Sequence, residues 1–491
     1  MSVYEPGGPP RLGWQMAKRF ALGSIIIVML SATAVASAVL LEVHDAINII
    51  ERESTPIPGV KNVLDDVPAG DPQTILVLGS DRRFGDKKLG LAPRSDTIIV
   101  VRLDPDKGAT AVMSLPRDLK VEIPGYGPDK INAAYAEGGP KLTVRTVRDL
   151  LGIPINHVIN VNFGGFQRAV NRLGCVYADI DRRYFNDRGG PGGYATIDLK
   201  PGYQRLCGRD SLDYVRYRHT DNDFVRAARQ QEFLRQAKDQ IGLGKVFGDR
   251  KELLRIFGRY TQTDIAQRND AAILRLIRLA YDSSKNPLTE IQFPAKPEGD
   301  YVEISYVELQ RTVDRFVNVK GNGKQDEGSK TKPKTIKRKR KLAPGLVLRR
   351  EAGENHVLNI TATLQPRLPV YFPKAILARG GYEDESPRMY TIRDRNKNRY
   401  RAYRLVLDHG DDGQYYGIQG TTWKAAPILD NPTDEVRMRK RTYQRYFDGR
   451  KIRMIAWKTP KAVYWVSNTL TRNLTNRQMM DIARSLQRIG Q

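Results

Sequence analysis

The stretch Thr74–Arg83, T-I-L-V-L-G-S-D-R-R, decides the fold, because a run of apolar residues ends there at a charged turn. Two further β-branched runs follow it, Thr97–Leu103 (T-I-I-V-V-R-L) and Ala109–Leu115 (A-T-A-V-M-S-L). Val158–Val161 (V-I-N-V) resembles them. Runs that are apolar on both faces are typical of strands in a sheet that is covered on both sides. These segments therefore predict an α/β domain.

Helical patterns alternate with the predicted strands. Apolar residues recur at helical spacing in three segments: Phe166–Leu173, Phe224–Ile241 and Asp264–Asp282. The alternation ends near Val317, so we expect the α/β domain to span residues 71–318. Residues 42–70 are expected to form a juxtamembrane helix and a Pro/Gly-rich spacer before it.

An uncharged apolar stretch over residues 20–41 is long enough to cross the ~30 Å hydrocarbon core of a bilayer as a helix. Basic residues precede it: Arg11, Lys18 and Arg19. By the positive-inside rule, residues 1–19 are a short cytoplasmic tail, and the bulk of the chain lies outside the cell membrane. A cleaved signal peptide is the alternative, because residues 36–38 fit a small-residue cleavage site.

The chain is strongly basic, with a formal net charge of +26 over 491 residues. Such an excess favours an anionic partner: nucleic acid, anionic lipid or a phosphate-rich polymer. The predicted location outside the membrane leaves the membrane and an anionic polymer, and we expect no nucleic-acid partner.

There are two cysteines, Cys175 and Cys207, both on the predicted outer side. One disulfide is the simple interpretation in an oxidising location. Two separate buried thiols are the alternative.

A second unit follows a basic linker. Residues 319–345 are rich in Lys and Gly and are expected to be a disordered tether. Residues 346–491 predict a separate α+β domain of unknown role, whose Tyr and Arg content either binds glycans or serves packing and solvation. We expect strands over Val357–Leu364, Tyr400–Leu407 and Tyr415–Thr421. Lys451–Trp457 and Ala462–Val466 are expected to pair as a hairpin. The final helix is expected over Thr475–Leu486, with Thr475 or Asn476 as its cap.

Charged residues lie where the predicted strands end. Asp81 directly follows the first strand, and Asp96 begins the next one. Strand ends are where α/β folds gather ligand sites, and two carboxylates at one sheet edge suit Mg²⁺. Arg117 ends the third strand, and Lys130 follows a Gly/Pro-rich loop towards the same rim. Taken alone, Asp81 and Asp96 are each better explained as turn or cap residues, and Arg117 is equally well explained by a surface ion pair.

The segment Tyr214–Gln231, Y-V-R-Y-R-H-T-D-N-D-F-V-R-A-A-R-Q-Q, interleaves arginines with carboxylates, and this pattern suits a diphosphate with a cation better than a duplex. On a helix, Arg226, Arg229 and Gln230 share one face. We expect the apolar residues between them to face the sheet: Val225, Ala228 and Phe233. A solvated basic helix face is the alternative interpretation.

Five separated motifs occur in order: L-G-S-D-R-R, R-S-D-T-I-I-V-V-R-L-D-P, S-L-P-R-D, K-I-N-A-A-Y-A-E-G-G and the arginine-rich segment above. In these motifs the chain, roughly from Asp71 to Val317, resembles the LytR–CpsA–Psr family. The resemblance implies a central mixed β-sheet covered by helices and a prenyl-chain groove. It also implies transfer of an anionic glycopolymer from a polyprenyl-pyrophosphate carrier to peptidoglycan, usually to the C6 hydroxyl of N-acetylmuramic acid.

The resemblance also implies residue roles. Asp81 and Asp96 would hold Mg²⁺, or Mn²⁺ in its place. For the pyrophosphate it implies the catalytic arginines Arg117, Arg216 and Arg218, and the substrate-binding residues Arg226, Gln230, Arg94 and Lys130. Arg229 joins the substrate-binding group because it shares the helix face of Arg226 and Gln230.

The chemistry of the step adds a base for the acceptor hydroxyl. Asp223 is the candidate, with Asp118 as another, and deprotonation by the substrate itself is the alternative.

Three other functions compete with this one. A pyrophosphatase would use the same lipid with water as the acceptor. A non-enzymatic binder of anionic wall polymers would need the basic residues but not the aspartate pair. A membrane-bound transcription regulator would need a cytoplasmic DNA-binding domain, for which the residues before Phe20 are too few.

Overall fold

The computed structural model describes residues 45–80, 95–187, 196–217, 223–241, 248–265, 270–319, 341–438 and 441–489, apart from positions 46, 69, 285, 287, 366, 411 and 412. The predicted membrane segment at 20–41 and almost all of the basic linker lie outside this part of the chain. Within it, none of the helices has the length and apolar character that crossing a bilayer requires.

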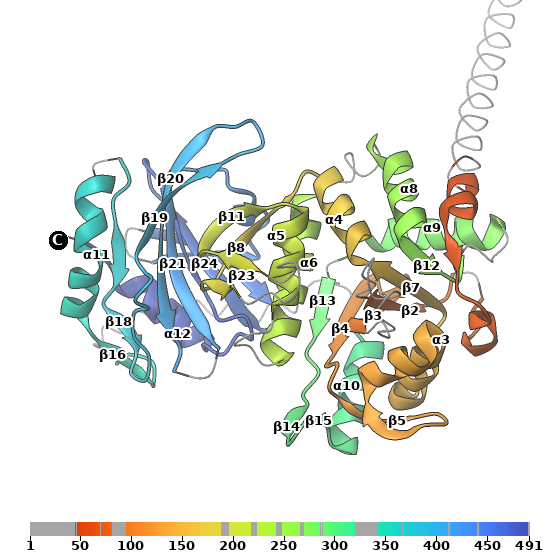
Figure 1. The fold of residues 1–491 in the computed structure, drawn as a ribbon. Coiled ribbons are helices and arrows are strands. Elements are labelled where there is room, and N and C mark those ends of the chain that lie inside the picture. Colours follow the sequence, from red (N-terminus) through yellow and green to blue (C-terminus); the bar gives the residue numbers. More distant parts are fainter. Residues whose placement is uncertain are drawn as a thin grey trace, which may run out of the picture.

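The first unit is built on a seven-stranded mixed sheet, which confirms the predicted fold (Figure 1). The strand order is β1-β12-β7-β2-β3-β4-β13. The strands have these bounds: β1 Thr55–Pro56, β2 Gln73–Ser80, β3 Ser95–Asp104, β4 Ala109–Leu115, β7 His157–Asn162, β12 Thr261–Thr263 and β13 Leu288–Ile291. Strand β2 is parallel to β7 and antiparallel to β3, and β4 is parallel to β13. All four predicted strands of this sheet are present.

Helices cover both faces of this sheet. Helices α3 (Ile131–Leu151) and α10 (Tyr306–Val317) pack on one face together with the 3₁₀ turn Val60–Val63. Helix α9 (Asp270–Ser284) packs on the other face with Ile47 and Ile50. The segment expected to be a spacer therefore contributes to the core of the domain.

Helix α9 begins later than predicted, because Asp264 is held at the end of β12. Its buried carboxylate accepts hydrogen bonds from the Val158 amide (2.8 Å) and pairs with His157 Nδ1 (2.9 Å).

A middle layer stands beside this sheet. It contains the antiparallel pair β8 (Val176–Ile180) and β11 (Gly202–Leu206) with three helices: α4 Phe163–Arg172, α5 Gly208–Arg216 and α6 Asp223–Gln240. The two helices predicted for this region, α4 and α6, are confirmed. Cys175 and Cys207 form the predicted disulfide, which joins the residue before β8 to the N-cap residue of α5. Smaller elements complete the unit: β5 Lys120–Ile123, β6 Gly127–Lys130, β9 Tyr184–Asn186, β10 Ile197–Leu199, α8 Arg250–Tyr260, β14 Lys296–Glu298 and β15 Tyr301–Glu303.

The second unit is a seven-stranded antiparallel sheet with helices on one face. Its order is β19-β20-β21-β25-β24-β23-β22. Its elements are β16 Leu346–Leu348, α11 Arg350–Leu364, β17 Tyr371–Pro373, β18 Ala375–Leu377, β19 Arg388–Arg393, β20 Arg399–Asp408, β21 Tyr415–Thr421, β22 Asp434–Met438, β23 Arg441–Asp448, β24 Lys451–Lys458, β25 Val463–Ser467, α12 Asn476–Ser485 and β26 Leu486–Arg488. The predicted β24–β25 hairpin is confirmed, and Thr475 caps α12 in a capping box. The α+β prediction holds for this unit.

The strand predicted over Val357–Leu364 is wrong, because this segment forms the end of α11. Val357, Ile360 and Leu364 are its buried residues, and this spacing places them on one helical face against the core of the second unit.

The second unit packs against the middle layer instead of standing apart (Figure 1). Tyr177 of β8 and Tyr203 of β11 share a hydrophobic cluster with Trp423 and Trp465. Within this contact, buried Asp179 accepts hydrogen bonds from Arg404 Nη1 (3.0 Å) and Trp465 Nε1 (3.1 Å). The two units therefore share a core as well as having their own.

Candidate active site

Strands β2, β4 and β7 end at one edge of the first sheet, and β3 begins there. Ser80, the last residue of β2, pairs with both Ser95 of β3 and Asn162 of β7. The register therefore places the end of β2 next to the start of β3 on one side and next to the end of β7 on the other. Such an edge is where open α/β sheets bind ligands.

The metal ligands are predicted to lie at this edge. Asp81 and Arg94 lie outside the described residues, and only the backbone of Asp96 is described. Ser80 and Ser95, which precede Asp81 and Asp96, face each other across the strand pair, so the backbone is compatible with a shared carboxylate site. In the described part of the chain no group of three or more His, Cys, Asp or Glu is placed to hold a metal. The metal site stays a prediction.

Arg117 lies in the turn after β4, at the same edge. Its Nε is 3.5 Å from Asp118 Oδ2, and Lys130 Nζ is 3.6 Å from Asp118 Oδ1. The Arg117 carbonyl accepts a hydrogen bond from the Asn132 amide at the start of α3, which fixes the turn. Arg117 and Lys130, predicted from separate motifs, are thus brought together around one carboxylate.

Arg216 ends α5, and its guanidinium lies over the ring of Phe163, 4.0 Å from the centroid. Phe163 directly follows β7, so this contact fixes Arg216 near the sheet edge. Gln230 Nε2 donates to the Val215 carbonyl (3.0 Å) and to Thr97 Oγ1 (3.3 Å). Gln230 therefore ties α6 both to α5 and to the beginning of β3, beside Asp96.

Arg226, Arg229 and Gln230 share one side of α6 as predicted, but the alternative of a solvated basic face is wrong. Their exposed fractions are 5%, 0% and 5%. The Arg229 guanidinium lies over the rings of Tyr184, Tyr214 and Tyr217, 4.8 to 5.7 Å from their centroids, and Nη2 donates to the Tyr217 carbonyl. Arg229 thus holds the residue that separates Arg216 from Arg218. We call Arg117, Arg216, Arg226 and Arg229 the site arginines.

The apolar side of α6 does not face the central sheet as predicted. Val225 and Ala228 pack against Leu470 of the second unit. Phe233 packs with the tyrosines of the middle layer. Sequence periodicity identified the buried positions but not the surface that buries them.

The structure does not describe the side chains of two predicted residues, and it adds one residue that the sequence analysis did not name. Arg218 lies outside the described residues, and of Asp223 only the backbone, at the start of α6, is described. Asp213 of α5 is a further titratable group in this region. Burial raises its pKa to about 6, although Arg209 and Arg216 act to lower it. Its helical position three residues before Arg216 was the one available sequence signal.

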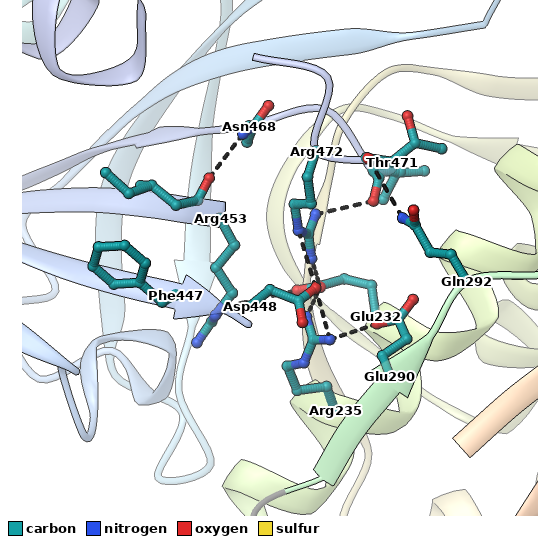
Figure 2. A network of polar contacts seen from close by, with 12 residues as sticks. Glu232, Arg235, Glu290, Gln292, Phe447, Asp448, Arg453, Asn468, Thr471 and Arg472 are labelled. Atoms are coloured by element: carbon teal, nitrogen blue, oxygen red, sulfur yellow. Dashed lines mark hydrogen bonds and ion pairs between the residues drawn. The ribbon is translucent and has the colours of Figure 1, made fainter. Parts of the chain in front are cut away.

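A second cluster of buried arginines joins α6 to the second unit (Figure 2). Glu232 accepts hydrogen bonds from Arg472 Nη2 and from Arg235 Nη1 (2.9 Å), and Arg453 Nη1 is 3.9 Å away. Burial alone would raise the pKa of Glu232, but Arg472, Arg235 and Arg453 outweigh it and lower this pKa to about 2. We call Arg235, Arg453 and Arg472 the interdomain arginines.

The same cluster includes two more carboxylates. Arg235 Nη2 is 2.5 Å from Glu290 Oε2 of β13 and 3.0 Å from Asp448 Oδ2 of the second unit. Three carboxylates and three arginines are thus gathered around the helix that also carries Arg226 and Gln230. Because Arg472 is 240 positions from Glu232 in the chain, no local sequence pattern could have revealed this cluster.

Residues 42–324, more than half of the chain, match the model of the LytR_cpsA_psr family. The chain belongs to this family. The family resemblance of the sequence motifs is thereby confirmed.

Three proteins of known name are similar to this chain. The chain is 29% identical over 293 residues to the polyisoprenyl-teichoic acid–peptidoglycan teichoic acid transferase TagU of Oceanobacillus iheyensis, covering 57% of this chain and 86% of that protein. It is 34% identical over 175 residues to the transferase TagT of Bacillus subtilis, covering 36% and 54%. It is 36% identical over 171 residues to the regulatory protein MsrR of Staphylococcus aureus, covering 34% and 49%. The chain thus matches about half the length of TagT and MsrR.

A solved structure of TagT bound to LIIa-WTA aligns with 54% of this chain and 98% of that chain, at 25% identity and a TM-score of 0.41.

Proposed function

We propose that this protein is a membrane-anchored phosphotransferase that moves an anionic glycopolymer from a polyprenyl-pyrophosphate carrier to peptidoglycan on the outer face of the membrane. Two observations carry the proposal: Arg117 lies in the turn after β4, and Arg216 packs on Phe163 directly after β7, at the same sheet edge. Gln230 ties helix α6, which also carries Arg226, to Thr97 at the start of β3. Family membership and the transferase names of TagU and TagT support it.

The proposed step exchanges one phosphorus–oxygen bond for another. The acceptor hydroxyl attacks the phosphorus that bears the glycopolymer, and the bond from this phosphorus to the bridging oxygen breaks. Polyprenyl phosphate leaves with the bonding electrons, and a phosphodiester joins the glycopolymer to the acceptor. Positioning and charge neutralisation supply most of the catalysis in such transfers.

The site arginines suit this task. Arg117 and Arg216, with Arg218, would bind the pyrophosphate through paired N–H groups, and Arg226 and Gln230 would bind beside them. Arg94 and Lys130 would extend the same rim. Arg229 is fully buried and holds the Tyr217 carbonyl, so we assign it a positioning role in place of the predicted substrate contact.

The hydroxyl proton and the metal complete the proposal. Asp223 or Asp118 would accept the proton, unless the leaving phosphate takes it. Asp81 and Asp96 would hold Mg²⁺, which when bound neutralises charge on the phosphoryl oxygens.

The direct test uses the full chain with a synthetic polyprenyl-pyrophosphate glycan of a few sugars, peptidoglycan oligomers and Mg²⁺. We expect mass spectrometry to find a phosphodiester conjugate and polyprenyl phosphate in equal amounts. Arg117→Ala should abolish the conjugate, whereas Arg437→Ala on strand β22 of the second unit should not.

The alternatives give different products. Phosphate-terminated glycan with no conjugate would replace the transferase by a pyrophosphatase. Tight retention of the polymer without any cleavage would leave a non-enzymatic binder. The topology has its own test: a reporter fused after Gln491 should be active only outside the cytoplasm.

A further inference from the structure

A cavity of about 640 Å³ lies between the two units, beside the interdomain arginines. Helix α6, strand β13 and helix α10 form the walls on the side of the first unit. The turn between β23 and β24 and the segment around Asn431 form the opposite walls. Figure 2 shows the residues at one side of it, with Arg472 and Arg235 facing each other across Glu232 and Asp448.

The charge of this cavity favours an anion. Six basic residues line it: Arg235, Lys238, Arg315, Lys451, Arg453 and Arg472. Four acidic residues line it: Asp239, Glu290, Asp430 and Asp448. The interdomain arginines are engaged with carboxylates. Lys238, Arg315 and Lys451 make no ion pair within 4.0 Å to any residue of the described part of the chain, and Arg315 and Lys451 lie at the exposed rim.

The remaining walls offer hydrogen bonds and flat apolar surface. Strand β13 is the last strand of its sheet and has a strand partner, β4, on one side only among the described strands, and its residues Leu288–Ile291 line the cavity. Of the two aromatic residues in the lining, Phe447 is half-buried, whereas Tyr446 is 1% exposed and belongs to the buried cluster around Trp423 and Trp465. Polar groups combined with one aromatic side chain suit a sugar ring, which has hydroxyl groups at its edge and C–H groups on its faces.

The cavity and the proposed active site share two elements, helix α6 and the sheet edge. From Gln230 to Lys238 the rise along α6 is about 12 Å at 1.5 Å per residue. Strand β13 runs parallel to β4, so its carboxyl end lies towards the sheet edge at which Arg117 follows β4.

We propose that this cavity binds the saccharide portion of an anionic oligosaccharide, as a subsite that lies beyond the reacting phosphate and is completed by the second unit. The inference rests on the proposed function for its link to turnover but not for its binding chemistry. The oligosaccharide comes from one of two sources, the donor glycopolymer or the acceptor glycan strand, and both carry sugars with anionic groups.

The first measurement is binding by the full chain in detergent, observed by calorimetry. The probes are a sugar–phosphate oligomer, a glycan tetrasaccharide bearing lactyl carboxylates, and a neutral N-acetylglucosamine tetramer. We expect at least one anionic probe to bind more tightly than the neutral one. Lys451→Glu and Arg315→Glu should each weaken that binding about tenfold, the value of one charge-assisted hydrogen bond.

Lys458→Glu is the matched control, because Lys458 is an exposed residue at the opposite end of β24 and makes the same charge change outside the cavity. Binding that is equal for the three probes, or that falls equally in Lys451→Glu and Lys458→Glu, would overturn the subsite. The anionic probe that binds identifies the source.

A kinetic measurement separates this inference from the proposed function. For a donor subsite, the ratio of kcat/KM for a long donor over a one-sugar donor should fall about tenfold in Lys451→Glu. For an acceptor subsite, the same fall should appear when acceptor length is varied. Binding of an anionic probe without any transfer would retain the subsite and refute the transferase. Transfer whose dependence on substrate length is the same in Lys451→Glu as in the unchanged protein would refute the subsite and retain the transferase.

Discussion

The two arginine clusters around α6 use the same side chain in different ways. Among the site arginines, Arg216 lies over Phe163 and Arg229 over three tyrosines. Arg117 is the exception, because its Nε lies 3.5 Å from Asp118 Oδ2. Each interdomain arginine lies within 4.0 Å of a carboxylate. An aromatic ring holds a guanidinium without adding net negative charge, whereas a carboxylate neutralises it. Burial of arginines therefore does not by itself identify an anion site; the groups that hold them do.

The comparison predicts its largest effect at Glu232. Glu232→Gln keeps the shape of the side chain but leaves three buried arginines with one negative charge fewer. We expect the free energy of unfolding to fall by about 3–5 kcal/mol, as when one partner of a buried pair is removed. Urea unfolding followed by tryptophan fluorescence measures it, since Trp423 and Trp465 lie at the contact between the units.

Glu435→Gln is the control for this substitution, because Glu435 lies on the exposed side of β22 and should cost less than about 1 kcal/mol. Acid titration of the unchanged protein gives a second measurement. The pKa of Glu232 is lowered to about 2, so its stabilising effect is complete above about pH 4.5 and is lost as the pH falls towards 2. Equal losses in the two variants would show that the cluster does not hold the units together.

The disulfide gives the next largest effect, on the side of the site arginines. Cys207 is the N-cap residue of α5, and Arg216 is the last residue of this helix. Replacing both cysteines by serine should lower the free energy of unfolding by about 3–4 kcal/mol in the chain-entropy model. It should also reduce transfer activity, because the start of α5 is released. Full activity after the replacement would show that α5 is positioned by its other contacts alone.

The sequence predicted one side of this comparison and not the other. Arg117 stands directly after a strand, so its place at the sheet edge follows from the α/β topology. Arg216, Arg226 and Arg229 stand in one local motif, which forms the end of α5 and the start of α6. The interdomain cluster joins Glu232 to Arg472, which is 240 positions away in the chain. No periodicity in the sequence indicates a contact over that separation. The same limit explains Val225 and Ala228, whose burial was predicted correctly but whose partner, Leu470, was not.

Local pattern failed in one element of the second unit. Val357–Leu364 contains valine, isoleucine and threonine, which favour strands, yet it forms a helix. Its buried residues are also consistent with helical spacing, and packing against the core of the second unit decided between the two. The side chains that the prediction placed at Asp81, Asp96 and Arg218 lie outside what the structure describes, so their roles remain predictions.

Substitution of the site arginines should affect activity more than stability. Arg117, Arg216 and Arg226, changed to lysine, keep the charge but lose the fork that binds two phosphate oxygens. We expect each lysine variant to be nearly as impaired as the alanine variant. The fall in kcat/KM should correspond to a loss of about 2–4 kcal/mol of transition-state stabilisation. The free energy of unfolding should change by no more than about 2 kcal/mol, the value of a desolvated contact between a guanidinium and a ring.

Salt dependence tests the rival explanation for these arginines. If only a positive field matters, lysine should restore activity at all three positions, and turnover should fall steeply with ionic strength. That outcome would favour a polymer-binding scaffold and would remove the distinction between the two clusters, because both would then act through charge alone.

The smallest predicted effect concerns Glu290, the carboxylate that the interdomain arginines satisfy least. Burial raises its pKa to about 7, with a further contribution from Asp448, although Arg235 lies 2.5 Å away. Arg235 shares its charge among three carboxylates, those of Glu232, Glu290 and Asp448. Since the pKa in the folded protein is above the ordinary value of 4.5, the folded state binds a proton that the unfolded chain has released. Stability from this group is therefore greatest below about pH 4.5 and is lost as the pH rises through 7.

We expect the free energy of unfolding to fall by about 1–3 kcal/mol between pH 5.5 and 8.5, relative to Glu290→Gln, which has no proton to lose. Urea unfolding at the two pH values measures the difference. Glu303→Gln is the control, because Glu303 pairs with Lys120 at the exposed surface. If the unchanged protein and Glu290→Gln respond equally to pH, Glu290 is ionised throughout and the interdomain arginines neutralise all three carboxylates. If the difference appears, the contact between the units weakens as the pH rises past neutrality, while Arg216 and Arg229, held by aromatic rings, keep their positions.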